Sequence, residues 1–174
     1  MKAAINISKI NILALLVICL GINTTSSNNM AIAQKIAHNN SSVIPVANIN
    51  EVKTFVYSWF ALLDRQVSEI SLLKFLDKNN LTMEFPEMTV NNPDDFNEWY
   101  SGVEEAISSN THDVRLVEVT PKGNGKFDVM VEVNWQAQTR EGETINQAYQ
   151  QQWKVVSDRN RRLLIQEYLV EEIN

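Results

Sequence analysis

Four side chains in this chain of 174 residues are our candidates for proton transfer: His112, Asp64, Tyr100 and Glu132. His112 is one of only two histidines, and the other, His38, precedes the patterned region. Asp64 closes a predicted helix, Tyr100 shares a helix face with Phe96 and Trp99, and Glu132 lies on the polar side of a predicted strand. Histidine, carboxylate and phenol groups are the usual acids and bases of enzymes. Each also has a structural interpretation, as a helix-end charge, a core tyrosine or a histidine bound by backbone groups.

Other kinds of chemistry have little support. The only cysteine, Cys19, falls in an apolar leader, so the remainder of the chain has neither a thiolate nucleophile nor a thiolate metal ligand. A single histidine in the patterned region leaves only carboxylates for a metal, which predicts no metal site. No glycine-rich nucleotide loop and no G-x-S-x-G motif occurs, so the sequence predicts no cofactor.

Aromatic residues form a second group of candidates. Trp135, Tyr149 and Trp153 fall on the apolar side of two predicted strands, and helical patterns contain Trp59 and Trp99. Such residues either line a cavity or pack as core. We expect these five to be the ligand-binding residues if the fold encloses a hollow.

The charge balance argues against nucleic acid as a partner. Fifteen Lys and Arg against 21 Asp and Glu give a net charge of −6. An acidic protein repels phosphate, and the one basic cluster, at 159–162, has the composition of a solvated turn.

The first 33 residues have the organisation of a signal peptide. Lys2 and Lys9 precede a 13-residue apolar run, Ile10 to Ile22, and Ala31-Ile32-Ala33 has the small residues that signal peptidase requires. As a helix the run would span about 20 Å, short of the roughly 30 Å core of a bilayer. We expect export to the periplasm or exterior, with an uncleaved membrane anchor as the alternative. Residues 34–49 are polar and read as a flexible linker.

Residues 50–174 have the patterns of one domain. Apolar residues from Val52 to Leu63 recur at spacings of three and four, which predicts a helix ending near Asp64 or Arg65. A shorter helix is expected over residues 69–76. Pro93 opens a third, which ends in the Ser-Ser-Asn cluster at 108–110.

After Thr111 the apolar period changes to two, as in strands. Turn residues at 121–125, 141–142 and 158–160 separate these segments and favour antiparallel hairpins. The sequence therefore predicts an α+β fold in which three helices pack on a meander of four long strands. The expected strands cover residues 81–85, 112–120, 127–137, 145–157 and 162–173.

The order of these segments resembles the nuclear transport factor 2-like superfamily, and within it the SnoaL-like branch. The likeness extends over about residues 50–172 and depends on several stretches together. They are Phe55-x-x-x-Trp59-Phe60-Ala61-Leu62-Leu63-Asp64, Asp95-Phe96-Asn97-Glu98-Trp99-Tyr100, Thr111-His112-Asp113-Val114, Val131-Glu132-Val133-Asn134-Trp135, Gln151-Gln152-Trp153-Lys154-Val155 and Ile165-Gln166-Glu167-Tyr168-Leu169-Val170.

The resemblance implies a cone, a curved sheet around the first helix with a pocket at the wide end, and a homodimer formed through the outer sheet face. Members include isomerases, dehydratases and cyclases that use Asp, His or Tyr in an apolar pocket, and also binding domains without catalysis. The family commonly keeps a histidine where His112 stands. We therefore expect a small apolar or amphipathic ligand in the cone. A lyase or isomerase using His112 with Asp64 or Tyr100 is one alternative. The other is a protein-docking module whose outer sheet face includes Met130, Glu132, Asn134, Gln136, Gln150 and Gln152.

Overall fold

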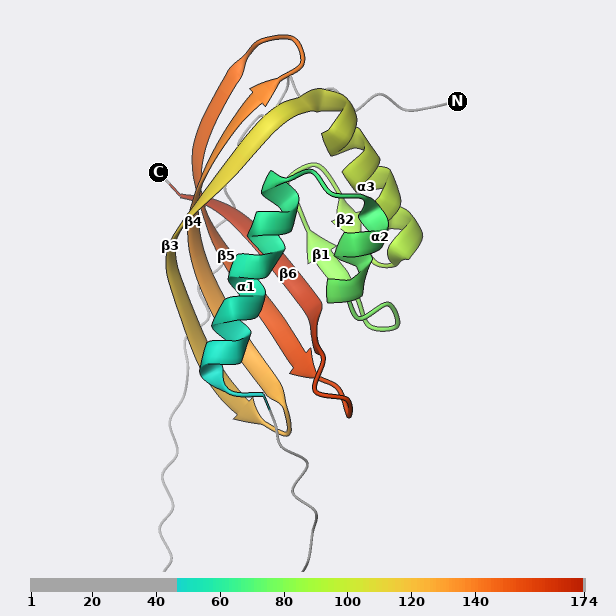
Figure 1. Cartoon of the computed structure of the whole chain (residues 1–174), viewed down its shortest axis with the longest axis vertical. Helices are drawn as coiled ribbons and strands as arrows, with labels where there is room; N and C mark the ends of the chain where they lie inside the picture. Colours follow the sequence, from blue (N-terminus) through green and yellow to red (C-terminus); the bar gives the residue numbers. More distant parts are fainter. Residues whose placement is uncertain (1–46, 174) are drawn as a thin grey trace, which may run out of the picture. The chain divides into compact units, whose positions relative to one another are not determined.

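A computed structural model describes residues 47–173 of the chain. The predicted signal peptide and all but the last three residues of the predicted linker lie outside this part. No helix within the described residues is long and apolar enough to cross a membrane. The domain is α+β, as predicted, with helices on the concave face of one curved sheet (Figure 1).

Helix α1 (Ile49–Asp64) lies along the concave face of the sheet (Figure 1). It begins at a capping box in which the Asn48 side chain accepts from the Glu51 amide at 3.0 Å and Glu51 accepts from the Asn48 amide at 2.7 Å. Its buried stripe has the predicted spacing: Val52, Val56, Trp59, Phe60 and Leu63. This stripe attaches the helix to the sheet.

The second predicted helix is shorter than expected. Helix α2 (Glu69–Leu72) is followed by one 3₁₀ turn, η1 (Leu73–Phe75), and Leu76 is already extended. The reason is tertiary, because Leu76 forms a β-bridge with Ile165 and the Asp77 amide donates to the Ile165 carbonyl at 2.9 Å.

Helix α3 (Pro93–Ala106) starts as predicted but does not end in the Ser-Ser-Asn cluster. The Asn92 side chain accepts from the amides of Asp94 and Asp95 and caps the helix. Strand β3 (Ile107–Gly123) follows without a loop, so residues 108–110 are strand and not helix end. Pairing with β4 (Lys126–Thr139) overrides the local preference, and the Ser108 hydroxyl donates to the Gln138 carbonyl at 2.9 Å.

The meander of four long strands is confirmed. Strands β3, β4, β5 (Thr144–Ser157) and β6 (Leu163–Ile173) pair antiparallel in sequence order. The predicted alternation of β4 is also correct, since Phe127, Val129, Val131 and Val133 are all buried. Strand β3 contains three register shifts, which let the sheet bend around α1.

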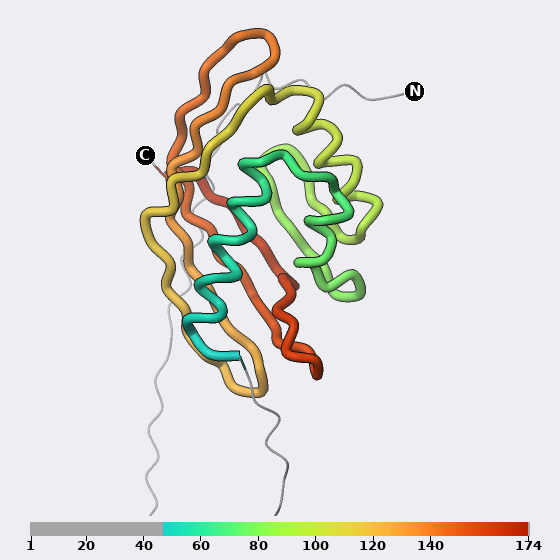
Figure 2. The backbone as a smooth tube through the Cα atoms, viewed as in Figure 1, coloured from blue at the N-terminus to red at the C-terminus, as the bar shows by residue number. Residues whose placement is uncertain are grey.

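The sheet has two further strands at its edge, so its order is β2-β1-β6-β5-β4-β3. Strand β1 (Thr82–Glu84) falls inside the predicted segment 81–85, whereas β2 (Thr89–Val90) is too short to show a period. Strand β1 pairs with β6 in parallel, a contact that local patterns do not reveal. Figure 2 shows how this edge (green) closes against the end of the chain (red).

Candidate functional site

The structure brings Asp64 and His112 together, although they are 48 positions apart. Asp64 is the last residue of α1, and His112 lies within β3 on the face that packs on α1. The His112 ring Nδ1 lies 2.6 Å from Asp64 Oδ1, and the His112 backbone amide donates to the same oxygen at 3.1 Å. The side chains of His112 and Asp64 are 13% and 27% exposed, so the pair is shielded without being sealed from water.

Neighbouring contacts join the same two elements. The Asn110 side chain donates to the Leu63 carbonyl at 3.4 Å, and the Gln66 side chain donates to the Ile107 carbonyl at 3.2 Å. These bonds satisfy a backbone group at the end of α1 and hold it against the first residues of β3. Hydrogen bonds from residues next to Asp64 and next to His112 therefore hold the two side chains in place relative to each other.

The tautomer of His112 follows from its partner. An ionised carboxylate can only accept hydrogen bonds, so Nδ1 carries the proton in this pair and Nε2 has the free lone pair of the neutral ring. Among the residues that the structure describes, none hydrogen-bonds to Nε2, and this nitrogen is not among the buried atoms that lack a partner. Nε2 is therefore free to exchange a proton with a bound molecule.

Aromatic rings surround the histidine. Its ring centroid lies 5.0 Å from that of Phe60 and 6.4 Å from that of Trp135, which is nearly parallel at 22°. Tyr149 lies 6.4 Å beyond Trp135, and both are half-buried. The result is a cluster of aromatic rings beside the imidazole of His112, which we call the mouth and define by His112, Trp135 and Tyr149.

Tyr100 is not part of this arrangement. Its hydroxyl donates to the Val67 carbonyl at 2.8 Å, and only 2% of the residue is exposed. Burial, and then the charges of Glu104 and Glu69, raise the pKa of Tyr100 to about 12. The hydroxyl is therefore committed to a structural bond away from His112.

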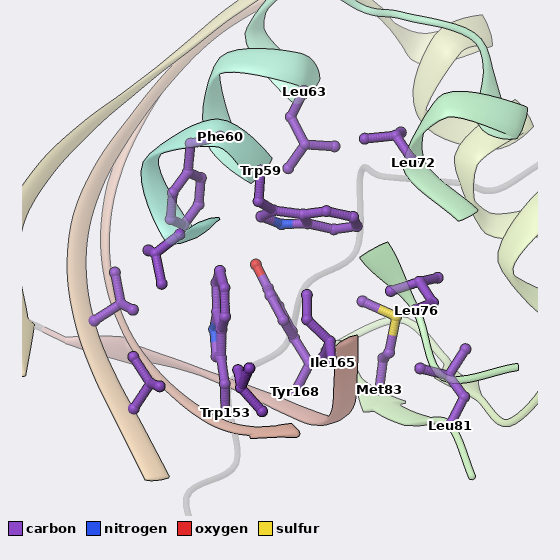
Figure 3. Packing of buried hydrophobic residues seen from close by; sticks show 14 of the residues in the cluster. Trp59, Phe60, Leu63, Leu72, Leu76, Leu81, Met83, Trp153, Ile165 and Tyr168 are labelled. Carbon is purple, nitrogen blue, oxygen red and sulfur yellow. The ribbon is translucent and has the colours of Figure 1, made fainter. Parts of the chain in front are cut away.

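Three of the five predicted ligand-binding aromatics are core residues in the structure. Trp59 and Trp153 are 0% and 1% exposed, and Trp99 is 8% exposed, with its indole N–H donating to Glu87 at 2.9 Å. Figure 3 shows Tyr168 between Trp153 and Ile165, with its oxygen directed toward Trp59. The Trp153 and Tyr168 rings stack at 4.8 Å. Side chains thus occupy the interior of the cone where we expected a pocket.

Two hollows among the described residues lie away from His112. One, of about 730 Å³, is lined by residues 47–50 of the α1 start and by residues of the β3–β4 turn, which Figure 2 shows side by side. The other, of about 310 Å³, lies between α2 and α3 and is lined by Glu69, Asn97, Tyr100, Ser101 and Glu104. Neither is lined by His112, so the candidate site coincides with neither hollow.

The remaining candidates lie on other surfaces. Glu132 pairs with Leu116 and Gln150 on the outer face of the sheet, alongside Met130. Within residues 47–173 no three His, Cys, Asp or Glu side chains gather as ligands for a metal ion. The candidate site is therefore the Asp64–His112 pair and the mouth.

Sequence reasoning missed two residues at this site. The sequence predicted that Phe60 is buried on α1 but did not place it at the site, and its ring packs against that of His112. Glu87 follows β1, and its charge acts on Tyr149 because the parallel β1–β6 pairing brings the loop after β1 to the end of β6. The apolar spacing of α1 contained a signal for Phe60, whereas no local signal existed for Glu87.

Comparison with known proteins defines the fold. No protein-family model and no curated protein matches the sequence. Solved structures match most of the domain. A nuclear transport factor 2-like superfamily protein from Salmonella enterica superposes with a TM-score of 0.66 at 10% sequence identity, and the match covers 72% of this chain and 90% of the Salmonella protein. For a putative scytalone dehydratase from Novosphingobium aromaticivorans the TM-score is 0.65 at 10% identity, with coverage of 71% of this chain and 82% of the other. For a ketosteroid isomerase-like protein from Erwinia carotovora the TM-score is 0.61 at 13% identity, with coverage of 79% of this chain and 99% of the other. The chain has the nuclear transport factor 2-like fold.

Proposed function

We propose that the mouth binds a small apolar or aromatic molecule and that His112 exchanges a proton with it, as in a lyase or isomerase. The observation that carries this proposal is the 2.6 Å contact between His112 Nδ1 and Asp64 Oδ1, which leaves Nε2 without a partner among the described residues. A positioned imidazole with a free nitrogen is a general base, and its protonated form is a general acid.

The carboxylate has two effects on such a base. It fixes the ring, because the backbone amide and Nδ1 of His112 both bind Asp64. It also accepts the hydrogen bond of Nδ1–H, which keeps the proton of the neutral ring on Nδ1 and leaves Nε2 as the nitrogen that can take a proton. Asp64 is therefore a positioning residue, and His112 is the group that touches the substrate.

The filled interior restricts the ligand to the mouth. Trp59, Trp153 and Tyr168 pack against one another where a deep ligand would lie. Trp135 and Tyr149 keep part of their surface exposed beside His112. A flat ring can stack on either of them, and such contacts contribute about 0.5–1.5 kcal/mol beyond the area that they bury.

The fold neighbours are consistent with this class of reaction. Two of them are named as a putative scytalone dehydratase and a ketosteroid isomerase-like protein. Those names describe those proteins, and a fold alone does not choose a function. Support for this chain comes from its own Asp64–His112 pair.

Proton exchange can be tested without knowing the substrate. The protein is incubated in D₂O with a panel of cyclic ketones, and deuterium at the carbon next to the carbonyl is measured by mass spectrometry. We expect uptake above background with at least one ketone and its loss in His112→Gln. Asp64→Asn should lower the rate, because an amide can either donate or accept and so no longer fixes the proton of His112 on Nδ1.

His38→Gln is the matched control, since it removes the only other histidine. It should leave exchange unchanged. Ketones that shift the NMR signals of the mouth without exchange would indicate a binding protein without catalysis. Absence of both binding and exchange across the panel would refute the proposal.

Export completes the proposal, because residues 1–33 have the pattern of a signal peptide. Fusion of the first 50 residues to alkaline phosphatase, which folds only outside the reducing cytoplasm, tests it in a bacterial host. Replacing Leu15 and Leu16 with Arg should abolish the phosphatase activity. Activity that survives this change would count against export through the leader.

A further inference from the structure

We infer that the ligand of the mouth carries a positive charge, such as an ammonium group, on or beside its apolar part. This inference rests on the proposed function, because it concerns the same site. It comes from the arrangement of Trp135 and Tyr149 next to carboxylates that have no cationic partner.

The topology places two carboxylates beside Tyr149. In the antiparallel pairing of β5 and β6, Glu172 lies directly opposite Tyr149, so both side chains are on the inner face. Strand β1 runs parallel to β6, so the loop after β1, with Glu87, emerges at the same end of the sheet. The carboxylate of Glu87 is held there by the Trp99 indole N–H at 2.9 Å.

The charge of these groups reaches the mouth. Burial, and then the charges of Glu172 and Glu87, raise the pKa of Tyr149 to about 12. Both charged groups that act on this phenol are acidic. On the other side of the mouth, Asp64 stands behind His112 at the C-terminal end of α1, where the helix dipole is also negative.

No cation in the described part of the chain neutralises Glu87 or Glu172. Six ion pairs form among residues 47–173, and none includes either glutamate. Arg140 binds the backbone carbonyl of Glu104 through its guanidinium at 2.9 and 3.1 Å. Both glutamates are exposed, and neither has a charged partner among the described residues, so their charge is available to a cation that binds beside Tyr149.

Aromatic faces beside carboxylates that have no ion-pair partner favour organic cations. A cation is attracted to the face of Trp or Tyr within about 6 Å of the ring centroid, and adjacent negative charges add to this attraction. An anionic ligand would be repelled by the same groups. An ammonium compound with an apolar body thus fits the mouth better than a carboxylate or a phosphate.

The test compares two probes of the same shape: benzyltrimethylammonium and its neutral isostere neopentylbenzene. Each is titrated into the full domain while NMR follows the ring signals of His112 and the indole signal of Trp135. We expect the cation to bind at least fivefold more tightly at low ionic strength. Glu172→Gln and Glu87→Gln should each reduce this preference about two- to fivefold, because both glutamates are exposed and solvent screens their charge.

Glu171→Gln is the matched control, because Glu171 pairs with Gln150 and lies on the opposite face of β6. It removes the same charge and should leave the preference unchanged. Equal binding of both probes, or an equal effect of Glu171→Gln and Glu172→Gln, would overturn the inference and leave the proposed acid/base site standing. If neither probe shifts the signals of His112 and Trp135, the inference is overturned, while the proposed function is decided separately by the ketone panel.

Discussion

Replacing Asp64 by alanine tests whether the contact between α1 and β3 stabilises the fold as its geometry suggests. The change removes the acceptor of two bonds from His112, one from Nδ1 at 2.6 Å and one from the backbone amide at 3.1 Å. Strand β3 is the edge strand of the sheet, and Asp64 is the only acceptor of this amide among the described residues. Water can replace the lost oxygen only in part, because the His112 side chain is 13% exposed.

The expected cost follows from these contacts. Hydrogen bonds to a charged group contribute about 1.5–3 kcal/mol each when buried. Asp64 is 27% exposed, which lowers this contribution through solvent screening. Removing a negative charge from the C-terminal end of a helix returns about 0.3–1 kcal/mol. We therefore expect Asp64→Ala to lower the free energy of unfolding by about 2 kcal/mol, and Asp64→Asn, which keeps an acceptor oxygen, by about half as much.

Urea unfolding followed by tryptophan fluorescence measures this loss, with the slope of the transition checked for a constant value. Asp113→Ala is the matched control: Asp113 is near His112 in the chain, but its ion pair with Arg115 is exposed, at 56% and 61%. Such pairs contribute about 0.2–1 kcal/mol. If Asp64→Ala costs no more than Asp113→Ala, the pair does not clamp the helix, and the reasoning from its geometry is refuted.

Three further predictions concern other parts of the chain. Folding raises the pKa values of Tyr100 and Tyr149 from 10.0 to about 12. The stability that the neutral phenols contribute is therefore complete below about pH 10 and is lost as the pH rises toward 12. Urea midpoints measured from about pH 8 to about pH 11.5 should show this decline. Gly125→Ala should cost more than Gly123→Ala. Both glycines have positive φ, +73° and +81°, but a Cβ on Gly125 would lie 3.1 Å from the carbonyl oxygen of Ser157 in β5, whereas one on Gly123 meets nothing within 4 Å. Thermal unfolding should show a loss of about 2 kcal/mol for Gly125→Ala and about 1 kcal/mol for Gly123→Ala, and equal losses would contradict this. The intact mass of the exported protein should equal that of a chain cleaved after Ala33. The mass of the uncleaved chain, found in the membrane fraction, would indicate an uncleaved anchor instead.

Local apolar patterns were sufficient to predict most of the helices and strands. The three- and four-residue spacing from Val52 to Leu63 predicted α1 because a helix buries one stripe of side chains. The alternation from Phe127 to Val133 predicted β4 because a strand buries every second residue. Both periods are properties of the backbone alone, so they can be read without knowing the partner surface.

The errors arose where distant segments decided the local structure. Residues 108–110 have loop composition, yet pairing with β4 makes them part of β3. Leu76 was expected to be helical, yet its bridge to Ile165 makes it extended. In both places the partner strand provides backbone hydrogen bonds that outweigh a weak local preference.

The amino-acid sequence by itself determined the class of fold, the candidate residues Asp64, His112, Trp135 and Tyr149, and the negative charge of the domain, because each depends on residue type and short-range period. Only the tertiary structure decided that Asp64 reaches His112, that Tyr100 does not, and that Trp59, Trp153 and Tyr168 occupy the interior of the cone. These outcomes depend on side-chain volumes and on contacts between segments far apart in the chain. Period and composition contain no information about either.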